Sequence, residues 1–454
     1  MSLPVKNPRS FDTFQFTTFD YEPTSGKASL VYRFDQGPEL VEIFRFPNAP
    51  WPLEANRQAA FESALSLLHS IAGISYYKAG LASELVFETE SPDEALAGFL
   101  TELYVEGLAE FAYVNELDLH GKIYFPAHGA ATLSHSLNLP ERALVAMGGG
   151  KDSLVGLQLV KNAGVEVQPV CVGSSTLIGE TVKRAGLPLI RIERSLAPEL
   201  AEMNRLGAWN GHVPVTAINS AALLCASILY GYKYIVFSNE RSADEPTLTT
   251  SGGRQVNHQY SKSSAFESKF RELIHKRVSP DVEYFSILRP FSELEIVRRF
   301  SDMTDFHDVY SSCNRNFHLT GSRMDRRWCL DCPKCRFAAL SLALFLPPPS
   351  VARIMGENLL DREDQAEGFR ALCGLGRNKP FECVGEAGEC RAALSRLAAS
   401  TLWGGQKIVR LLSSELAQVE VPDLENLLAP SDYHFIPTAL NILLAPERAA
   451  NEPE

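Results

Sequence analysis

The feature that most constrains the fold is a run of three glycines between an apolar segment and an amphipathic one. Residues 143–147 (ALVAM) are short and apolar, which is typical of a buried strand, and residues 151–162 have apolar side chains at helical spacing. The intervening Gly148, Gly149 and Gly150 permit positive φ angles and a tight turn. A strand that turns directly into a helix begins a βαβ unit, so we expect a parallel sheet.

The same alternation of apolar and amphipathic segments continues downstream. We expect strands at 165–173, 187–192, 232–238 and 284–288, and helices at 176–185, 216–229 and 292–300. Helical crossovers between parallel strands cover both faces of such a sheet. The predicted fold class is therefore α/β, with a parallel, doubly wound sheet.

Two further regions flank this sheet. Short alternating runs between residues 11 and 46 predict a small antiparallel sheet, and a later helix is expected to be capped by Ser91. Three prolines at 347–349 predict a linker, after which helical spacing resumes. We therefore expect three parts: an acidic N-terminal α+β domain (1–140), a central α/β domain (141–346) and a C-terminal helical region (347–454).

The charge balance limits the partners. The chain has 454 residues and a net charge of -12, and residues 1–140 hold 8 Lys/Arg against 18 Asp/Glu. Binding of nucleic acid needs clustered basic residues, so we expect a small-molecule ligand and no nucleic acid. The chain has no apolar run of about 20 residues and no secretory apolar core, which predicts no membrane insertion and a cytoplasmic location. The sequence leaves the oligomeric state open.

The glycine turn has the composition of a phosphate-binding loop. Its N–H groups and the following helix N-terminus attract an anion, while Lys151 adds a positive charge and Ser153 a hydroxyl. Asp152 is suited to hold Mg²⁺ against the same phosphates. The turn is not a Walker A loop, which has four residues between its first glycine and Gly-Lys-Ser/Thr. A tight glycine turn without a ligand is the alternative.

Four cysteines lie close together in the sequence, at Cys313, Cys329, Cys332 and Cys335. Such spacing lets several sulfur atoms bind one tetrahedral ion, and without a secretory signal it favours metal binding over disulfides. The favoured interpretation is a structural Zn²⁺ site, with an iron–sulfur cluster or metal-free thiols as alternatives. The neighbouring run Arg323–Arg327 is interpreted as a solvated loop, with contact to substrate phosphates as the alternative.

Polar segments at 210–214, 238–245 and 257–264 are expected at the carboxyl edge of the sheet, where open α/β sheets bind ligands. Carboxylates for metal binding or general-base chemistry are Glu240 and Asp244. Arg241, Arg254 and Lys262 are candidates for anionic substrate groups, and His212 for proton transfer. Solvated connecting loops are the alternative.

The strand, glycine turn and helix resemble the PP-loop of ATP pyrophosphatases, whose pattern is Ser-Gly-Gly-x-Asp-Ser. Asp152 and Ser153 match, but Gly148 replaces the first serine and removes one hydroxyl. The resemblance covers roughly residues 143–336 and implies a sheet of the adenine nucleotide alpha hydrolase-like type. It also implies ATP and Mg²⁺, cleavage between the α and β phosphates, and adenine beside main-chain groups at Val172 and Gly173. Several PP-loop enzymes that act on deazapurines or tRNA have a similar four-cysteine group.

The whole chain is similar to a narrower family, the UDP-N-acetyl-α-D-muramoyl-L-alanyl-L-glutamate epimerases of bacterial cell-wall synthesis. The segments that carry this resemblance are AMGGGKDS (146–153), NGHVPVTAINSAALL (210–224), SNERSADEPT (238–247), NHQYSKSSAFE (257–267) and WCLDCPKCRF (328–337). The resemblance implies ATP- and Mg²⁺-dependent inversion of the terminal L-Glu of UDP-MurNAc-L-Ala-L-Glu to D-Glu, through an adenylated α-carboxylate, with release of AMP and pyrophosphate.

The resemblance also implies roles for the candidate residues. The glycine turn would hold the phosphates and Asp152 the Mg²⁺. Acid–base work and carboxylate binding would fall to an unassigned pool of His212, Glu240, Asp244, Tyr260 and Lys262. Two other functions stay open: a PP-loop enzyme that modifies a tRNA or a deazapurine, and a non-catalytic ATP-binding protein, which the missing serine favours.

Overall fold

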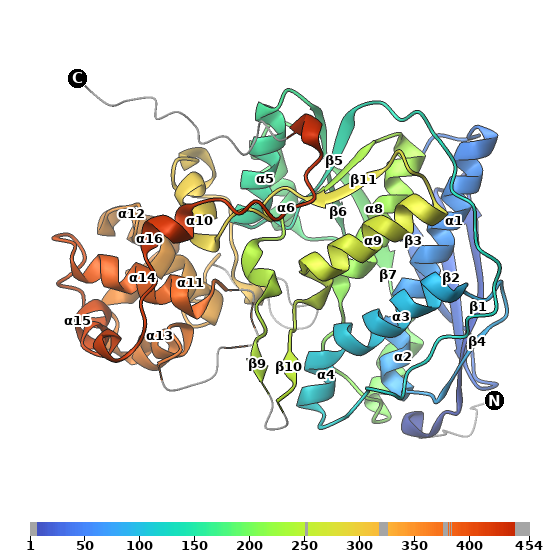
Figure 1. The fold of residues 1–454 in the computed structure, drawn as a ribbon, viewed down its shortest axis with the longest axis horizontal. Coiled ribbons are helices and arrows are strands. Elements are labelled where there is room, and N and C mark those ends of the chain that lie inside the picture. Colours follow the sequence, from blue (N-terminus) through green and yellow to red (C-terminus); the bar gives the residue numbers. More distant parts are fainter. Residues whose placement is uncertain are drawn as a thin grey trace.

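A nine-stranded sheet runs through the centre of the molecule (Figure 1). The computed structural model describes residues 7–249, 253–316, 326–375, 380, 382 and 384–440, so residues 323–325 of the predicted Arg323–Arg327 loop lie outside the described residues. In spatial order the strands are β11 (Glu283–Ser286), β8 (Tyr234–Phe237), β5 (Arg142–Ala146), β6 (Glu166–Val172), β7 (Ile190–Ser195), β3 (Leu40–Arg45), β2 (Lys27–Phe34), β1 (Thr13–Glu22) and β4 (Glu84–Phe87).

Helices occupy the connections of the sheet and the C-terminal end of the described chain. Those of the first 230 residues are α1 (Ala55–Ala72), α2 (Ile74–Gly80), α3 (Glu94–Gly107), α4 (Ala109–Val114), α5 (Lys151–Asn162), α6 (Thr176–Arg184), α7 (Glu199–Arg205) and α8 (Val215–Tyr230). They are followed by α9 (Ser264–Arg277), α10 (Glu293–Ser301), α11 (Pro333–Leu342), α12 (Pro348–Met355), α13 (Ala366–Leu372), α14 (Ala387–Ala398), α15 (Lys407–Ser413) and α16 (Leu424–Leu428).

Half of the sheet has the predicted parallel, doubly wound arrangement. β5 pairs in parallel with β6 on one side and with β8 on the other, and β7 and β11 extend the two ends. Alternate side chains of β5 enter different cores: Leu144 packs with α8 and α9, whereas Ala143 and Val145 pack with α5 and α10. Helices therefore cover both faces, and the α/β class is confirmed. Because β8 follows β7 in the chain but pairs with β5, the winding reverses between β5 and β8, which makes their carboxyl ends the topological switch point.

The N-terminal strands continue this sheet. β1, β2 and β3 pair antiparallel as predicted, but β3 also pairs antiparallel with β7, in the register Ile43↔Ser195 to Arg45↔Glu193. The predicted small sheet is thus part of a larger one. A local sequence pattern does not predict a pairing between two strands that are so far apart in the sequence. Helix α1 packs against α8, so the N-terminal region shares a hydrophobic core with the parallel half of the sheet.

Two predicted details were wrong. Asp93, and not Ser91, caps α3, because its side chain accepts a hydrogen bond from the Leu96 N–H at 2.9 Å. The proline run is not an extended linker, since Pro348 and Pro349 begin α12; proline is favoured in the first turn of a helix, where no N–H is needed. The C-terminal helices share a core with α5 and α10. The borders at residues 140 and 346 stay a prediction.

The C-terminal helices, coloured orange to red in Figure 1, gather at one end of the molecule, opposite the blue N-terminal strands. After α16 the chain returns toward the sheet, where Ser431 donates its N–H to the Pro290 carbonyl at 2.8 Å. Within the described ranges, no helix combines the length and the apolar character that a membrane crossing requires.

Candidate functional site

A cavity of ≈ 270 Å³ opens at the switch point of the sheet. The glycine turn after β5 forms one wall, and the segment after β8, including Ser238 and Glu240, forms another. Gly149 has a φ of +79°, a conformation that favours glycine. Gly156 lets α5 approach β8 closely, since a Cβ at this position would lie 2.3 Å from the Ser238 Oγ. The sequence motif is thus placed where open α/β sheets bind their ligands.

Two carboxylates hold the buried ammonium group of Lys151. Its Nζ donates hydrogen bonds to Asp152 Oδ1 and to Glu293 Oε2. Burial lowers the pKa of Lys151, but the two negative charges outweigh that effect and raise it overall, so the side chain stays charged. Burial raises the pKa of Glu293 well above its usual range; Lys151 opposes the rise, whereas Asp152 and Glu240 increase it. These three carboxylates and Lys151 all line the cavity.

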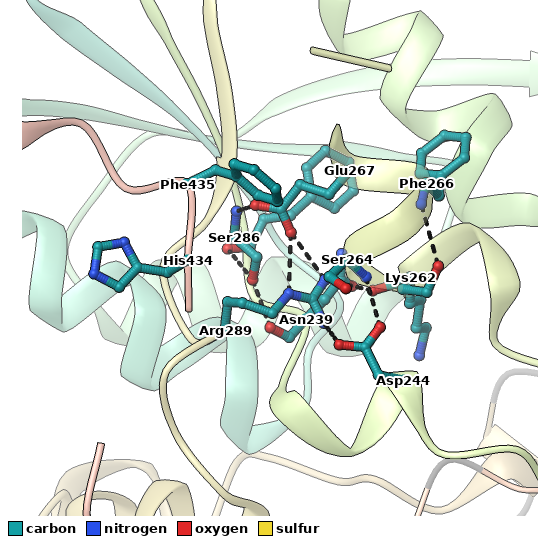
Figure 2. Close-up of polar contacts among 12 residues, drawn as sticks. Asn239, Asp244, Lys262, Ser264, Phe266, Glu267, Ser286, Arg289, His434 and Phe435 are labelled. Atoms are coloured by element: carbon teal, nitrogen blue, oxygen red, sulfur yellow. Dashed lines mark hydrogen bonds and ion pairs between the residues drawn. The ribbon is translucent and has the colours of Figure 1, made fainter. Parts of the chain in front are cut away.

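Glu240 and Lys262 come from different loops and line the same cavity. Arg289, 1% exposed, holds both loops by their backbone: its Nη1 donates to the Glu240 carbonyl at 2.9 Å and its Nη2 to the Lys262 carbonyl at 2.5 Å. The Glu267 carboxylate accepts from Nε and Nη2 of the same guanidinium, at 3.1 and 2.9 Å. Figure 2 shows this buried pair between the strand carrying Ser286 and the two loops. Arg289 is therefore a positioning residue for the cavity.

Asp244 is placed differently from Glu240. It accepts the Ser264 N–H at 2.7 Å and lies 3.8 Å from Arg289 Nη1, so it ties its loop to the start of α9 (Figure 2). Arg241 donates its Nη2 to the Leu427 carbonyl at 3.3 Å and thus reaches toward the C-terminal helices. Neither side chain is among those that line the cavity.

A second polar group lies where the N-terminal region meets the loop before α8. Lys78 on α2 is 4% exposed, and its Nζ donates to Asn210 Oδ1 at 2.9 Å. His212 Nδ1 lies 3.2 Å from Glu110 Oε2 on α4. Burial lowers the pKa of His212 to about 4, assisted by the positive charges of His258, Lys262 and Lys78. The loop leads into α8, whose Thr216 and Asn219 line the cavity, so His212 lies shortly before a cavity-lining residue in the chain.

The remaining predicted residues do not line the cavity. Arg254 is exposed and pairs with Asp118 at 2.9 Å. The Tyr260 hydroxyl donates to Glu102 Oε1 at 2.8 Å, which ties its loop to α3. Val172 is the last residue of β6 and Gly173 follows it, and the Gly173 carbonyl accepts from Arg191 Nη1 at 2.9 Å. Their predicted ligand contacts stay untested.

The four cysteine sulfurs converge beside the cavity. All lie within 4.8 Å of one another, with separations of 3.7 Å for Cys329–Cys335, 3.9 Å for Cys332–Cys313 and 3.5 Å for Cys332–Cys335. A tetrahedral ion with Zn–S bonds of about 2.3 Å separates its sulfurs by about 3.8 Å, so the arrangement fits one such ion. A multinuclear iron–sulfur cluster needs wider spacing, because irons and sulfides lie between its ligands. Ser311 and Ser312 precede the first cysteine and line the cavity, as does Lys334.

Sequence reasoning missed Glu293, Arg289 and Lys78. Glu293 looked like an ordinary acidic residue in the first turn of a helix after the Ser292 cap. Arg289 lies beside Pro290, next to a predicted strand, with no motif around it. For Lys78 the available signal was one lysine within the otherwise apolar ISYYKAG. In each case the role depends on partners that lie far away in the sequence.

Comparison with known proteins extends over nearly the whole chain. Residues 5–287 match the model of the MurL N-terminal domain, and residues 309–426 match that of the MurL C-terminal domain. The chain belongs to the MurL family. A relative from Xanthomonas oryzae, named UDP-N-acetyl-alpha-D-muramoyl-L-alanyl-L-glutamate epimerase, is 46% identical over 95% of this chain and 97% of its own length. MurL relatives with the same name from Micromonospora and Salinispora tropica are each 36% identical, over 96% and 98% of this chain and 98% and 99% of their own lengths.

Proposed function

We propose that this protein is an ATP-dependent epimerase that inverts the terminal L-Glu of UDP-MurNAc-L-Ala-L-Glu to D-Glu, as a step of peptidoglycan precursor synthesis. The observation that carries the proposal is the glycine-turn cavity at the switch point, in a chain whose full-length relatives carry this epimerase name. We include in the proposal a PP-loop mode of ATP binding, supported by the match of Asp152 and Ser153 to that motif.

The chemistry explains why an epimerase would use ATP. Removing the Cα proton next to an ionised carboxylate is difficult, because the carbanion adds negative charge beside an existing one. In the proposed first step, an α-carboxylate oxygen attacks the α-phosphorus of ATP, the bond to the bridging oxygen of the β-phosphate breaks, and pyrophosphate leaves. The resulting acyl adenylate lacks the carboxylate charge, so its enolate can be stabilised by hydrogen-bond donors and cations. After deprotonation and reprotonation on the opposite face, water adds to the acyl carbon and AMP leaves.

The cavity contains chemical groups suited to each step of this proposed reaction. The backbone N–H groups of the glycine turn, Lys151 and the Ser153 hydroxyl would bind phosphate oxygens. Bound Mg²⁺ would supply charge neutralisation at the phosphates, and Asp152 is the half-exposed carboxylate next to the turn that would hold it. Glu240 and Lys262 line the cavity and are the candidates for proton transfer at Cα. Neutral His212, near Lys262, is the third candidate.

The decisive assay is incubation with ATP, Mg²⁺ and UDP-MurNAc-L-Ala-L-Glu in D₂O. We expect AMP and pyrophosphate in equal amounts, D-Glu in the hydrolysed product, and deuterium at Cα of the inverted residue. Reactions without ATP, or with UDP-MurNAc-L-Ala, serve as controls. Pyrophosphate release that depends on tRNA or a deazapurine, or tight ATP binding with no turnover, would instead support one of the two rival functions.

We propose that the four cysteines hold a structural Zn²⁺ ion. Because Cys313 follows Ser311 and Ser312, and Lys334 lies between Cys332 and Cys335, the ion would fix one wall of the cavity. We expect about one zinc per chain by elemental analysis, and a lower melting temperature after removal by a chelator or in Cys332→Ser. Cys171→Ser, at a buried cysteine outside the cluster, is the control for metal content. A full complement of zinc in Cys332→Ser, or iron in place of zinc, would contradict the assignment.

A further inference from the structure

Lys78 differs from the other buried cations of the protein. Lys78, Lys151 and Arg289 are the lysine and arginine residues that are buried in the described part of the chain. Lys151 pairs with two carboxylates and Arg289 with Glu267. The ion pairs among the described residues include none with Lys78, whose ammonium donates to the neutral amide oxygen of Asn210. A buried charge without a counter-charge is costly, so its presence calls for a reason.

The surroundings of Lys78 are suited to an anion. Burial lowers the pKa of Lys78 to about 8, so the ammonium form still predominates at neutral pH. Burial, together with the charges of His258, Lys262 and Lys78, lowers the pKa of His212 to about 4, so His212 is neutral at pH 7 and offers hydrogen bonds. Its Nδ1 lies 3.2 Å from Glu110 Oε2. An anionic ligand here would restore the missing counter-charge and raise the pKa of Lys78.

The position of Lys78 and its neighbours relative to the cavity indicates which part of the substrate would bind there. The loop that carries Asn210 and His212 continues into α8, which contributes Thr216 to the cavity, and Lys262 lines the cavity itself. A ligand bound to Lys78 would therefore extend toward the nucleotide site. In the proposed reaction the α-carboxylate loses its charge on adenylation, whereas the γ-carboxylate stays ionised throughout. A fixed cation is suited to the group whose charge persists.

We infer that Lys78, Asn210 and His212 form a binding site for the γ-carboxylate of the substrate's terminal glutamyl residue, and that this site makes the enzyme selective for glutamate over neutral residues. The inference rests on the proposed function and assigns a substrate contact to α2 and to the loop before α8. The nucleotide cavity remains the place where the α-carboxylate reacts.

The test compares UDP-MurNAc-L-Ala-L-Glu with its γ-amide, UDP-MurNAc-L-Ala-L-Gln. We expect wild-type protein to favour the glutamate compound about 100-fold in kcat/KM. Lys78→Met should abolish that preference by raising KM for the glutamate compound and leaving KM for the glutamine compound unchanged. Because Lys78→Met removes an uncompensated buried charge, its melting temperature should be unchanged or higher. Lys276→Met, at an exposed lysine paired with Glu272 on α9, is the matched control and should change neither quantity.

A second variant tests the same site in the opposite way. Asn210→Asp places a carboxylate next to the Lys78 ammonium and should raise the melting temperature. It should also weaken binding of the glutamate compound, which is measured by calorimetry without ATP. If Lys78→Met lowered kcat/KM equally for both compounds, Lys78 would be assigned to the sugar nucleotide that the two compounds share, and the inference would be overturned. So would a lower melting temperature with the preference intact. A wild-type protein that binds both compounds but epimerises neither would count against the proposed function alone, since calorimetry still measures the preference.

Discussion

Lys151 and Lys78 are both buried, but their surroundings are opposite in charge. Lys151, at the glycine turn, contacts the carboxylates of Asp152 and Glu293, and Lys78, at the N-terminal junction, contacts the amide of Asn210. In the first region, the charge of Lys151 is balanced by its own partners before any ligand arrives, so a phosphate must compete with them. In the second region, the Lys78 ammonium donates its hydrogen bond to a neutral amide. The comparison indicates that the glycine-turn cavity is held in shape by its own ion pairs, whereas the proposed γ-carboxylate site at Lys78 would gain its counter-charge from the ligand.

The largest effect is expected at the balanced site. Asp152→Asn should reduce AMP formation about 1000-fold, because it removes the carboxylate proposed to hold Mg²⁺ against the phosphates. ATP binding should persist, since Lys151 loses one competing partner. The measurement is pyrophosphate release at saturating ATP, together with ATP affinity. Asp302→Asn, at the exposed end of α10, is the control, and an Asp152→Asn protein with unchanged turnover would contradict the metal role.

A smaller effect is expected when the cation of the balanced site is removed. Lys151→Met leaves Asp152 and Glu293 facing each other without a counter-charge and should cost about 3 kcal/mol of stability at pH 8. The pKa of Glu293 is already raised by burial, and a raised pKa means that stability is lost as pH rises, so the loss should be smaller at pH 5. Melting temperatures at both pH values check this.

The double variant Lys151→Met/Glu293→Gln should recover much of the lost stability at pH 8, because it removes the carboxylate left unpaired. A double variant no more stable than Lys151→Met would show that charge balance does not hold this site together.

The smallest effect concerns Glu389, an anionic counterpart of Lys78. Its buried carboxylate accepts the N–H groups of Leu294 at 3.2 Å and Glu386 at 2.7 Å. Burial, followed by the charge of Glu386, raises the pKa of Glu389 from 4.5 to about 7. Its contribution to stability is therefore fully present below pH 4.5 and is lost as pH rises through 7.

Glu389→Gln should reduce the fall in melting temperature between pH 4.5 and pH 8 and make the protein about 1 kcal/mol more stable at pH 8. Part of the gain is offset because glutamine has one acceptor oxygen, so one of the two accepted hydrogen bonds is lost. Glu425→Gln, at a helix of the same region, is the control. If the melting temperature depended on pH in the same way in Glu389→Gln and in wild type, the Glu389 carboxylate would titrate near its ordinary pKa.

Local pattern was sufficient for the parallel half of the sheet and for the glycine turn. An apolar strand, three glycines and an amphipathic helix follow one another directly, so their geometry depends on neighbours in the sequence. The site around the turn depends on long-range contacts instead: Glu293 reaches Lys151 across 142 positions, and Lys78 reaches Asn210 across 132. Polar residues that the sequence grouped together also separate in space, since Glu240 lines the cavity whereas Tyr260 binds Glu102 on α3.

The pairing of β3 with β7 has a consequence for how the gene can be divided. A fragment that starts at residue 141 would keep the glycine turn and the cysteines, yet its β7 would become an open edge, ready to associate with other strands. The same cut would strip α1 from α8 and expose apolar surface on that helix. Truncation at this border should therefore give aggregation-prone material, and the two halves are expected to work only when produced as one polypeptide.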